Sequence, residues 1–251
     1  MGQALLGGLI RAKWAAPTEL TVVEVIDQQR QSLEAAFPGV QVLAEPRAGI
    51  DTIVAVKPDL AVNVCRGLDQ PARIVSIAAG ITIAAMEAAL PADTPVVRVM
   101  PNTPSLVGFG AAGVAGGTAA SADDVGWAVS ILAAVGEAVV VPEHLLDAVT
   151  GLSGSGPAYV FLVAEALIDA GVSAGLPADV SATLAGQTLL GAATLLMSGQ
   201  STAAELRAGV TTPAGTTAAG LRVLEQKAIR AAFIDAVQAA TDRSRQLGQG
   251  G

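Results

Sequence analysis

The chain has very few of the side chains that enzymes most often use for acid–base chemistry or for binding metals. Its 251 residues include one histidine, His144, and one cysteine, Cys65. A single histidine excludes a histidine-based metal cluster and a histidine–aspartate relay. A lone cysteine cannot form an intramolecular disulfide, which favours a reducing compartment. We therefore expect a cytoplasmic protein without a bound metal.

Charged and aromatic residues are also scarce. Charged residues make up 14% of the chain and aromatic residues 3%, whereas 52% of the chain is hydrophobic and 28 residues are glycine. An average soluble domain has roughly 25% charged residues, so the low value predicts that much of the surface is covered by subunit contacts. The net charge of −8 argues against a nucleic-acid partner, which would need a basic patch.

Two long uncharged stretches raise the question of a membrane. They run from Val99 to Ala122 and from Val180 to Ala204. The first contains Pro101, Pro104 and several glycines, which would leave backbone groups unpaired in lipid. The second contains many serine, threonine and glutamine side chains. No basic segment followed by an apolar run opens the chain as a secretory signal would. We expect a protein that does not enter a membrane.

The first part of the chain alternates between predicted strands and predicted helices. Short β-branched runs predict strands at Leu20–Val25, Val40–Leu43, Thr52–Val56, Ile74–Ala78, Val96–Met100, Ala111–Ala115 and Ala138–Val141. The segments between them predict helices at Gln28–Phe37, Leu60–Leu68, Ile83–Ala89 and Ala122–Ala134. Several strands are apolar throughout, as is usual for parallel strands that are covered on both faces. This alternation predicts a doubly wound α/β domain over residues 1–141.

The strand signals stop after Pro142. Helical patterns follow at Pro157–Ala170, Ala178–Met197, Thr202–Ala208, Thr217–Glu225 and Ala228–Gln246. The residues from Gln246 to Gly251 are expected to form a loose tail. We therefore predict a second, all-helical domain over residues 142–251.

A dinucleotide-binding pattern is present in part at the start of the chain. Residues 1–10 look like the first helix of a dinucleotide-binding fold. Glu24 ends an apolar strand about twenty residues after Gly2, where such folds place the acid that binds the cofactor ribose. The first strand of the fold and the first two glycines of G-x-G-x-x-G do not precede this helix in the sequence, so Gly2 would be the third glycine. The alternative is an ordinary second residue at Gly2 and a solvated strand end at Glu24.

Three turns that follow predicted strands are candidates for contacting the same cofactor. They are Ala55-Val56-Lys57-Pro58, Ala78-Ala79-Gly80 and the turn at Asn102. Ligands of open α/β sheets bind outside the carboxyl ends of the strands, and small residues there let the backbone approach the ligand. The alternative is that these are only tight connections, with Lys57 an ordinary solvated lysine and Asn102 a turn former.

Three longer motifs occur in order along the chain. They are Val99-Met100-Pro101-Asn102-Thr103-Pro104, Thr150-Gly151-Leu152-Ser153-Gly154-Ser155-Gly156-Pro157-Ala158-Tyr159 and Gly209-Val210-Thr211-Thr212-Pro213-Ala214-Gly215-Thr216-Thr217. Together with the turns after the earlier strands, they resemble the pyrroline-5-carboxylate reductase family over essentially the whole chain. The resemblance implies a Rossmann domain, a helical dimerisation domain, and homodimers that often assemble further into decamers. It also implies the last step of proline biosynthesis, in which NADPH or NADH transfers a hydride to 1-pyrroline-5-carboxylate and L-proline forms.

The threonine-rich loop at residues 211–217 opens onto a predicted helix. Free N–H groups at a helix N-terminus form an anion site that suits a substrate carboxylate, although the threonines could instead only cap their own helix. The resemblance places Thr212, Gly215, Thr216 and Thr217 in the substrate-binding loop. It makes Thr217 the catalytic residue, with its hydroxyl near the ring nitrogen, and it places the segment Ser153–Pro157 near the nicotinamide.

The sequence departs from the family pattern at several positions. Gly209 stands where the family commonly has asparagine, Ala214 where it commonly has glycine, and Gln200 where glutamate is frequent. Val25 follows Glu24 at a position where an arginine or a serine would serve the 2′-phosphate of NADPH. Because Glu24 would repel that phosphate, this pair of residues favours NADH.

Two other functions fit parts of the pattern. A β-hydroxyacid dehydrogenase with the same two-domain plan would need a lysine on the helix that follows Ser153–Pro157, and residues 157–172 contain none. A non-catalytic oligomeric scaffold would keep the helical domain while its nucleotide site decayed. The intact threonine loop argues against the scaffold, and we therefore expect an enzyme.

Overall fold

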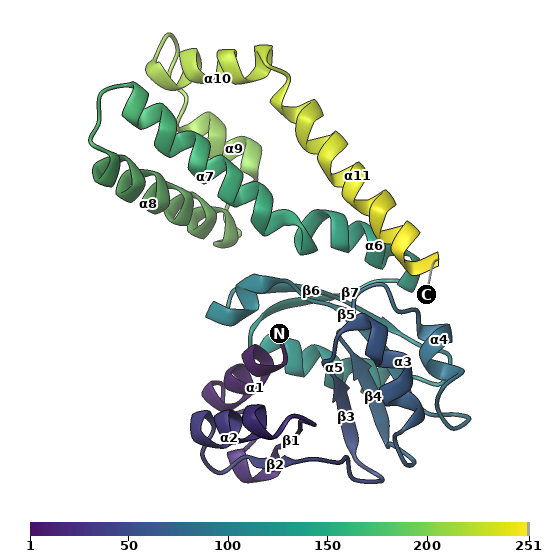
Figure 1. Cartoon of the computed structure of the whole chain (residues 1–251). Helices are drawn as coiled ribbons and strands as arrows, with labels where there is room; N and C mark the ends of the chain where they lie inside the picture. The colour runs from purple at the N-terminus through teal and green to yellow at the C-terminus, as the bar shows by residue number, and fades with distance from the viewer. Residues whose placement is uncertain (250–251) are drawn as a thin grey trace. The chain divides into compact units, whose positions relative to one another are not determined.

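The computed structural model describes residues 1–249, which form two compact units (Figure 1). The first unit contains Met1–Ser155 together with the chain from Gln238 onward, and the second contains Gly156–Val237. The helical segment just after Pro142 thus groups with the first unit, because Leu146 is fully buried in one of its hydrophobic clusters. The functional division between residues 141 and 142 stays a prediction.

The first unit is built on two β-sheets. The larger sheet has the order β3 (Asp51–Val54), β4 (Arg73–Ser76), β5 (Val96–Met100), β6 (Gly110–Gly116) and β7 (Gly136–Val140). A separate parallel pair consists of β1 (Thr21–Val23) and β2 (Gln41–Leu43). All the predicted strands are present, with slightly different ends, and β5 has the predicted bounds.

The strands of the larger sheet are not all parallel. The pairs β3–β4 and β4–β5 are parallel and so is β6–β7, but β5 and β6 are antiparallel. Because β6 and β7 are parallel to each other, both run opposite to β3, β4 and β5. Only a short 3₁₀ turn, η2 (Thr103–Val107), and its flanking residues connect β5 to β6. A parallel connection would need a dozen or more residues, so this link permits only the antiparallel arrangement.

The strand β1 forms one edge of the small sheet, and β3 forms one edge of the larger sheet. Among residues 1–249, no strand pairs with the outer edge of β1 or with the outer edge of β3. In the usual dinucleotide-binding order, a further parallel strand stands between the equivalents of these two strands. The observed order agrees with the expectation that the first strand of the fold is not among these residues.

Helices cover both faces of the larger sheet. On one face, α1 (Gly2–Arg11) and α5 (Ala122–Ala133) pack against Val75, Val97 and Val114. On the other face, α3 (Pro58–Arg66) and α4 (Ile83–Glu87) pack against Ile74 and Val96. Neighbouring residues of a strand point to opposite faces, so strands buried on both faces read as continuous apolar runs. A further helix of this region, α2 (Asp27–Ala36), follows β1.

An ion-pair cluster joins the elements at the amino ends of the strands. Arg73 donates to Asp51 of β3 at 2.8 Å and lies 3.3 Å from a carboxylate oxygen of Asp124 at the start of α5. Its guanidinium also stacks on the ring of Trp127 at 4.8 Å from the centroid. This cluster lies at the edge of the sheet opposite to the carboxyl ends of β3, β4 and β5.

The second unit consists of helices. They are α7 (Gly156–Ser173), α8 (Ala178–Met197), α9 (Ala203–Gly209), α10 (Thr216–Gln226) and the first part of α11 (Ile229–Gln249). The predicted bounds of α8 are those observed. Ser181 of α8 is buried and donates to the carbonyl of Ile168 on α7 at 2.7 Å. The helix α11 continues to Gln249, so the predicted loose tail is wrong from Gln246 to Gln249, and residues 250–251 lie outside the described part.

The end of α11 belongs to the first unit. Ser244 is buried and its hydroxyl donates to Asp147 of α6 (Leu146–Val149) at 2.6 Å. A Cβ atom added at Gly248 would lie 3.4 Å from the carbonyl oxygen of Gly80. The last turns of the helix are therefore packed against ordered chain, which explains why they are helical.

The long helices of the second unit carry many exposed apolar side chains. Examples are Phe161, Leu162, Leu184, Leu190, Leu195, Met197, Val223 and Ile234, which are half or more exposed. Two helical stretches, Glu143–Ser173 and Ala178–Met197, are long and apolar enough to cross a membrane by length and composition alone, which is weak evidence. On α8 only Ser181 and Ala185 are buried. These surfaces need a covering partner.

Candidate cofactor and substrate sites

The carboxyl ends of β3, β4 and β5 meet at one edge of the larger sheet. The register pairs Val54 with Ser76 and Ser76 with Arg98, so these parallel strands end side by side. The segments that follow them are residues 55–58, residues 77–80 and the turn at Asn102. Ligands of open α/β sheets bind at this edge. The structure therefore brings the three predicted cofactor turns together.

The turn after β3 lies beside the start of α1. A Cβ atom added at Gly2 would lie 3.1 Å from the Cβ atom of Ala55. This close approach is the role expected of the third glycine in a dinucleotide-binding turn. Val56, Lys57 and Pro58 are exposed, and within the described residues the ammonium group of Lys57 makes no ion pair. The charge of Lys57 is thus free to meet an anionic ligand at this edge.

The turn after β4 combines a fixed backbone with small side chains. Ser76 and Ala78 are buried, and the Ser76 hydroxyl accepts from the N–H of Ala78 at 3.3 Å. Gly80 has a φ of +76°, a left-handed conformation that favours glycine. Ala79 is exposed, whereas a Cβ atom added at Gly80 would lie 4.0 Å from the Cβ atom of Leu247 on α11. This turn offers a rigid backbone that is open to a ligand at Ala79.

Glu24 lies just beyond the end of β1. Its carboxylate accepts from the N–H of Ile26 at 2.9 Å, and its own carbonyl accepts from the guanidinium of Arg30 at 2.7 Å. Arg30 also pairs with Asp27 on the same helix. These bonds fix the backbone and the carboxylate of Glu24 in one position. A fixed acid at a strand end is the feature that accepts hydrogen bonds from a ribose.

Asn102 is buried directly after β5, and both ends of its amide are bound. Its Nδ2 donates to the carbonyl of Ser153 at 3.0 Å, and its Oδ1 accepts from the N–H of Ala111 at 2.9 Å. Ser153 lies in a π-helical turn, η4 (Thr150–Gly154), that precedes α7. Sequence reasoning treated Asn102 as a cofactor contact or a turn former and missed this link to Ser153.

The threonine loop of the second unit leads into α10. The helix begins after Gly215, and no side chain caps it. Within residues 1–249, the backbone N–H groups of Thr216 and Thr217 have no protein acceptor. Thr216 is exposed and Thr217 is half-buried. These unpaired donors, together with the positive end of the helix dipole, can bind a carboxylate.

The loop before α10 is tightly built. Gly215 donates to the carbonyl of Thr212 at 3.0 Å, and a Cβ atom added at Gly215 would lie 2.3 Å from the Thr212 hydroxyl oxygen. Ala214 has a φ of +58°, which is unfavourable for any residue with a side chain. The hydroxyl of Thr211 is turned back to the carbonyl of Arg207 at 2.6 Å. Thr212 is an exposed residue of this loop.

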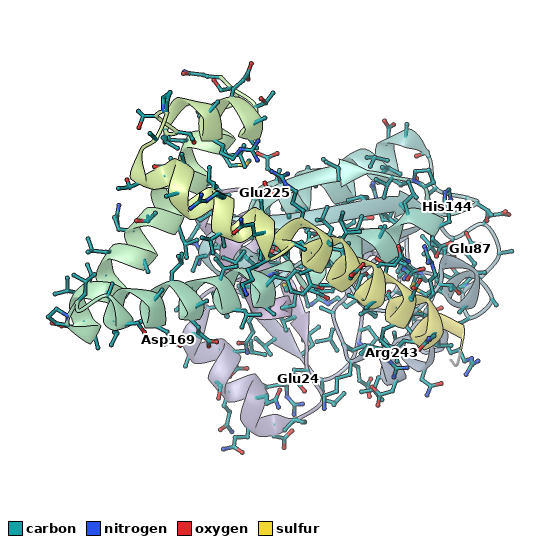
Figure 2. The ribbon with its side chains drawn as sticks, turned by 90° about the horizontal axis from the view of Figure 1, so that it is seen from above. Glu24, Glu87, His144, Asp169, Glu225 and Arg243 are labelled. Atoms are coloured by element: carbon teal, nitrogen blue, oxygen red, sulfur yellow. The ribbon has the colours of Figure 1, made fainter. Side chains whose placement is uncertain are left out.

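The single histidine and the single cysteine of the chain lie outside the candidate cofactor and substrate sites. His144 is exposed on the 3₁₀ turn η3 (Glu143–Leu145), and its side chain is labelled in Figure 2. His144 is thus a surface residue at the start of a short helical turn. Cys65 on α3 is buried, and burial raises the pKa of its thiol, which keeps it unreactive.

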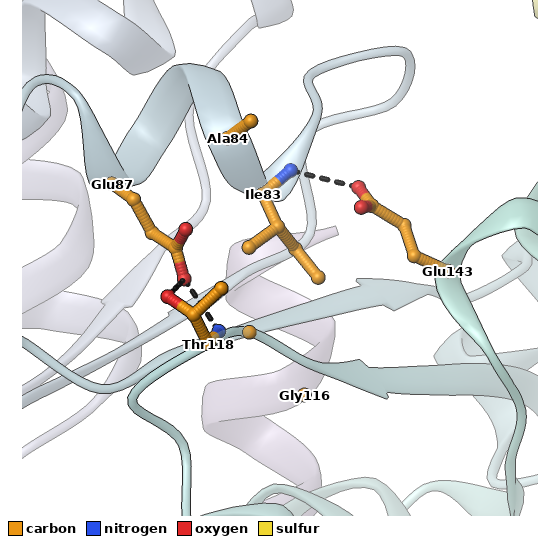
Figure 3. A pocket seen from close by; sticks show the side chains of 7 residues that line it. Ile83, Ala84, Glu87, Gly116, Thr118 and Glu143 are labelled. Atoms are coloured by element: carbon orange, nitrogen blue, oxygen red, sulfur yellow. Dashed lines mark hydrogen bonds between the residues drawn. The ribbon is translucent and has the colours of Figure 1, made fainter.

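A hollow of about 310 Å³ that sequence reasoning did not suggest lies between α4, the end of β6 and η3 (Figure 3). Glu87 and Glu143 line it, and both carboxylates are engaged. Glu87 accepts from the N–H and the hydroxyl of Thr118 at 2.7 and 2.8 Å. Glu143 accepts from the N–H of Ile83 at 2.7 Å and from Arg98 at 2.9 Å. These carboxylates tie loops together, and the hollow is no part of the candidate site.

Known proteins resemble this chain along its whole length. Residues 143–247 match the family model described as pyrroline-5-carboxylate reductase dimerisation. A pyrroline-5-carboxylate reductase of Corynebacterium melassecola is 42% identical over 259 residues, covering 99% of this chain and 96% of that protein. The solved structure of a pyrroline-5-carboxylate reductase from Coxiella burnetii is 32% identical, with a TM-score of 0.90 and coverage of 98% of this chain and 94% of that one. A Plasmodium falciparum pyrroline carboxylate reductase solved with NADP bound is 29% identical, with a TM-score of 0.82 and coverage of 99% and 94%.

Proposed function

This chain belongs to the pyrroline-5-carboxylate reductase family, and from that premise we propose that it reduces 1-pyrroline-5-carboxylate to L-proline with NADPH or NADH. The observation that carries the proposal is the identity of about 40% to reductases over nearly the whole chain. The unpaired N–H donors at the start of α10 and the three turns at the carboxyl edge of the sheet support it.

The carboxyl edge has the properties that a nicotinamide dinucleotide requires. Residues 55–58 and 78–80 are small or exposed and would hold the cofactor through their backbone, while Lys57 would attract its phosphates. Gly2 lets α1 start close to the turn after β3. When bound, the cofactor supplies the hydride. The task of the protein is to orient the cofactor and the substrate and to hold them within reach of each other.

Glu24 sets the expected cofactor preference. Its fixed carboxylate would accept hydrogen bonds from the ribose hydroxyls of NADH and would repel the 2′-phosphate of NADPH. The Plasmodium falciparum relative was solved with NADP, so the family includes proteins that bind the phosphorylated form. The ratio of kcat/KM for the two cofactors should favour NADH in this protein, and the variant Glu24→Ser should move the ratio toward NADPH.

The threonine loop would hold the substrate. The free N–H groups of Thr216 and Thr217 would bind the carboxylate of pyrroline-5-carboxylate, and Gly215 keeps the approach open. The hydroxyl of Thr212, an exposed residue of the same loop, would give a further hydrogen bond.

The Thr217 hydroxyl would orient the C=N bond of the substrate for hydride transfer. Its hydroxyl would contact the ring nitrogen, which carries the proton of the reactive iminium, while the hydride adds to the neighbouring carbon C5. The π electron pair of the C=N bond would then move onto nitrogen, and the product is L-proline. Because the hydride and the proton come from the cofactor and the iminium, the chain needs no histidine and no pair of catalytic carboxylates.

The matched dimerisation domain supports a homo-oligomer. We assign the exposed apolar faces of α7 and α8 to this contact between copies rather than to a membrane, since the domain model spans both helices. The proposed assembly is an obligate dimer, which further contacts would extend to a decamer, and the proposed location is the cytoplasm. A monodisperse monomer at micromolar concentration in light scattering would contradict this assembly.

Steady-state kinetics test the proposed function. The purified protein should oxidise NADH or NADPH, followed by ultraviolet absorbance, only when pyrroline-5-carboxylate is present. A β-hydroxy acid with the oxidised cofactor provides the control for the related dehydrogenases. Turnover of the β-hydroxy acid, with none of pyrroline-5-carboxylate, would overturn the proposal.

A further inference from the structure

A buried amide joins three segments at the carboxyl edge of the sheet. Asn102 is only 8% exposed. Its Nδ2 donates to the Ser153 carbonyl at 3.0 Å, and its Oδ1 accepts from the Ala111 N–H at 2.9 Å. One side chain therefore connects the end of β5, the start of β6 and the turn η4. These bonds fix the direction of the amide, because one end donates and the other accepts.

The Ser153 carbonyl needs this donor because of the local sequence. In a regular helix, the carbonyl of Ser153 would accept from the N–H of residue 157. Residue 157 is proline, which has no N–H. The chain forms a π-helical turn here, in which the N–H of Ser155 bonds to the carbonyl of Thr150 at 2.8 Å. Such turns are rare and occur frequently at functional sites. Asn102 supplies the donor that Pro157 lacks.

The turn η4 is pressed against the end of β5. A Cβ atom added at Gly154 would lie 2.8 Å from the methyl carbon of Met100, the last residue of β5. Gly154 thus leaves room for the end of the Met100 side chain, and the amide of Asn102 holds the backbone of the turn. The Gly154–Met100 contact and the Asn102–Ser153 bond both lie at the carboxyl end of β5, which neighbours the turn after β4.

We propose that Asn102 is a positioning residue for the hydride transfer. It holds the turn η4 against the carboxyl end of β5, where the proposed function, on which this inference rests, places the nicotinamide. Both ends of its amide are bound to backbone groups, so it acts through the turn rather than by touching the cofactor. The motif that contains Asn102 and the motif that contains Ser153 and Pro157 therefore act together to hold the turn η4 in place.

The variant Asn102→Ala removes the donor and the acceptor together. It should lower kcat about tenfold or more, since a buried acceptor is left unpaired and the turn moves. The isotope effect measured with cofactor deuterated at the transferred position should rise, because the hydride step becomes slower than product release. The KM for pyrroline-5-carboxylate should stay near the wild-type value. The variant Asn63→Ala, at an exposed asparagine on α3, is the matched control and should leave kcat, the isotope effect and the KM unchanged.

A second variant separates positioning from stability. In Asn102→Ala/Pro157→Ala, residue 157 regains an N–H that can bond to the Ser153 carbonyl within the helix. The melting temperature should recover toward the wild-type value, while kcat stays low, because the tie to β5 is still missing. Recovery of kcat together with the melting temperature would mean that Asn102 only satisfies a buried carbonyl, and it would overturn the proposal.

Hydrogen exchange keeps this test independent of turnover. Asn102→Ala should speed the exchange of backbone amides at residues 111–113 and 150–156, whereas Asn63→Ala should not. Unchanged exchange in these segments overturns the inference whatever the kinetics show. If the wild-type protein does not reduce pyrroline-5-carboxylate at all, the proposed function fails, and the exchange result still decides whether Asn102 holds the turn.

Discussion

Gly215 is the position in the proposed substrate loop with the least room for a side chain. The substitution Gly215→Ala, which adds one methyl group, tests whether that room is needed for substrate binding. The backbone of Gly215 has φ −78° and ψ 173°, which any residue can adopt, so Gly215→Ala adds no backbone strain. The new Cβ atom would lie 2.3 Å from the Thr212 hydroxyl oxygen and 3.1 Å from the Thr212 carbonyl oxygen. The Thr212 side chain must then leave its position in the loop.

The expected effect is on substrate binding. Turning Thr212 into another rotamer and losing its hydrogen bond to the substrate costs about 1–2 kcal/mol together, which raises the KM for pyrroline-5-carboxylate by roughly five- to thirtyfold. The hydride step should change little, so kcat should stay within about twofold of the wild-type value. Steady-state kinetics at saturating cofactor measure both quantities.

A double-mutant cycle tests the structural reason. In Thr212→Ala the hydroxyl oxygen is absent, and the nearest atoms to a Cβ at residue 215 are then the Thr212 carbonyl oxygen at 3.1 Å and the Cβ at 3.5 Å. Thr212→Ala/Gly215→Ala should therefore have nearly the same KM as Thr212→Ala alone, with a coupling of about 1 kcal/mol. Additive effects of the two changes would refute the reasoning. Gly126→Ala on α5, where a Cβ meets open space, is the control and should leave KM unchanged.

Three further outcomes are expected. Thr217→Ala should lower kcat about ten- to a hundredfold with a smaller change in KM, because the backbone donors survive and only the hydroxyl is lost; an unchanged kcat would leave Thr217 as a helix residue only. Ala214→Gly should raise the free energy of unfolding by about 0.5–1 kcal/mol in urea titrations. Glycine relieves the strain of the left-handed φ of +58°, and this gain exceeds the cost of a more flexible unfolded chain. A loss of stability would show that the loop conformation is different. Ser121→Ala should destabilise the protein by about 1 kcal/mol at neutral pH because it removes the cap of α5. Hydrogen bonds from Ser121 lower the pKa of Asp124 below its usual value, so this bond stabilises above the unfolded pKa and is lost as the pH falls through the folded one. The penalty should accordingly shrink in acid, and a penalty independent of pH would exclude the carboxylate as the cause.

Patterns within a single segment were predictable from the sequence. Runs rich in β-branched residues predicted strands such as β5, in which Val96 and Val97 are buried on opposite faces of the sheet. The bounds of α8 followed from Pro177 at its start and the small polar segment after Met197. The carboxyl-edge turns were predictable too, since all parallel strands of one sheet end at the same edge.

Features that depend on contacts between distant segments were not predictable. The helical end of α11 depends on Ser244 meeting Asp147, residues nearly a hundred positions apart. The bond from Asn102 to the Ser153 carbonyl is of the same kind. A signal for it exists in the sequence, because Pro157 removes the helix donor for Ser153, but it does not identify the replacement.

Tracing the hydrogen that is transferred tests the central claim most directly. The protein is incubated with pyrroline-5-carboxylate and with NADH or NADPH deuterated at the transferred position, and the product is analysed by mass spectrometry and NMR. We predict L-proline that carries one deuterium at C5, formed in equal amount to the oxidised cofactor. Oxidation of the cofactor without labelled L-proline, or no reaction with either cofactor, would contradict the account.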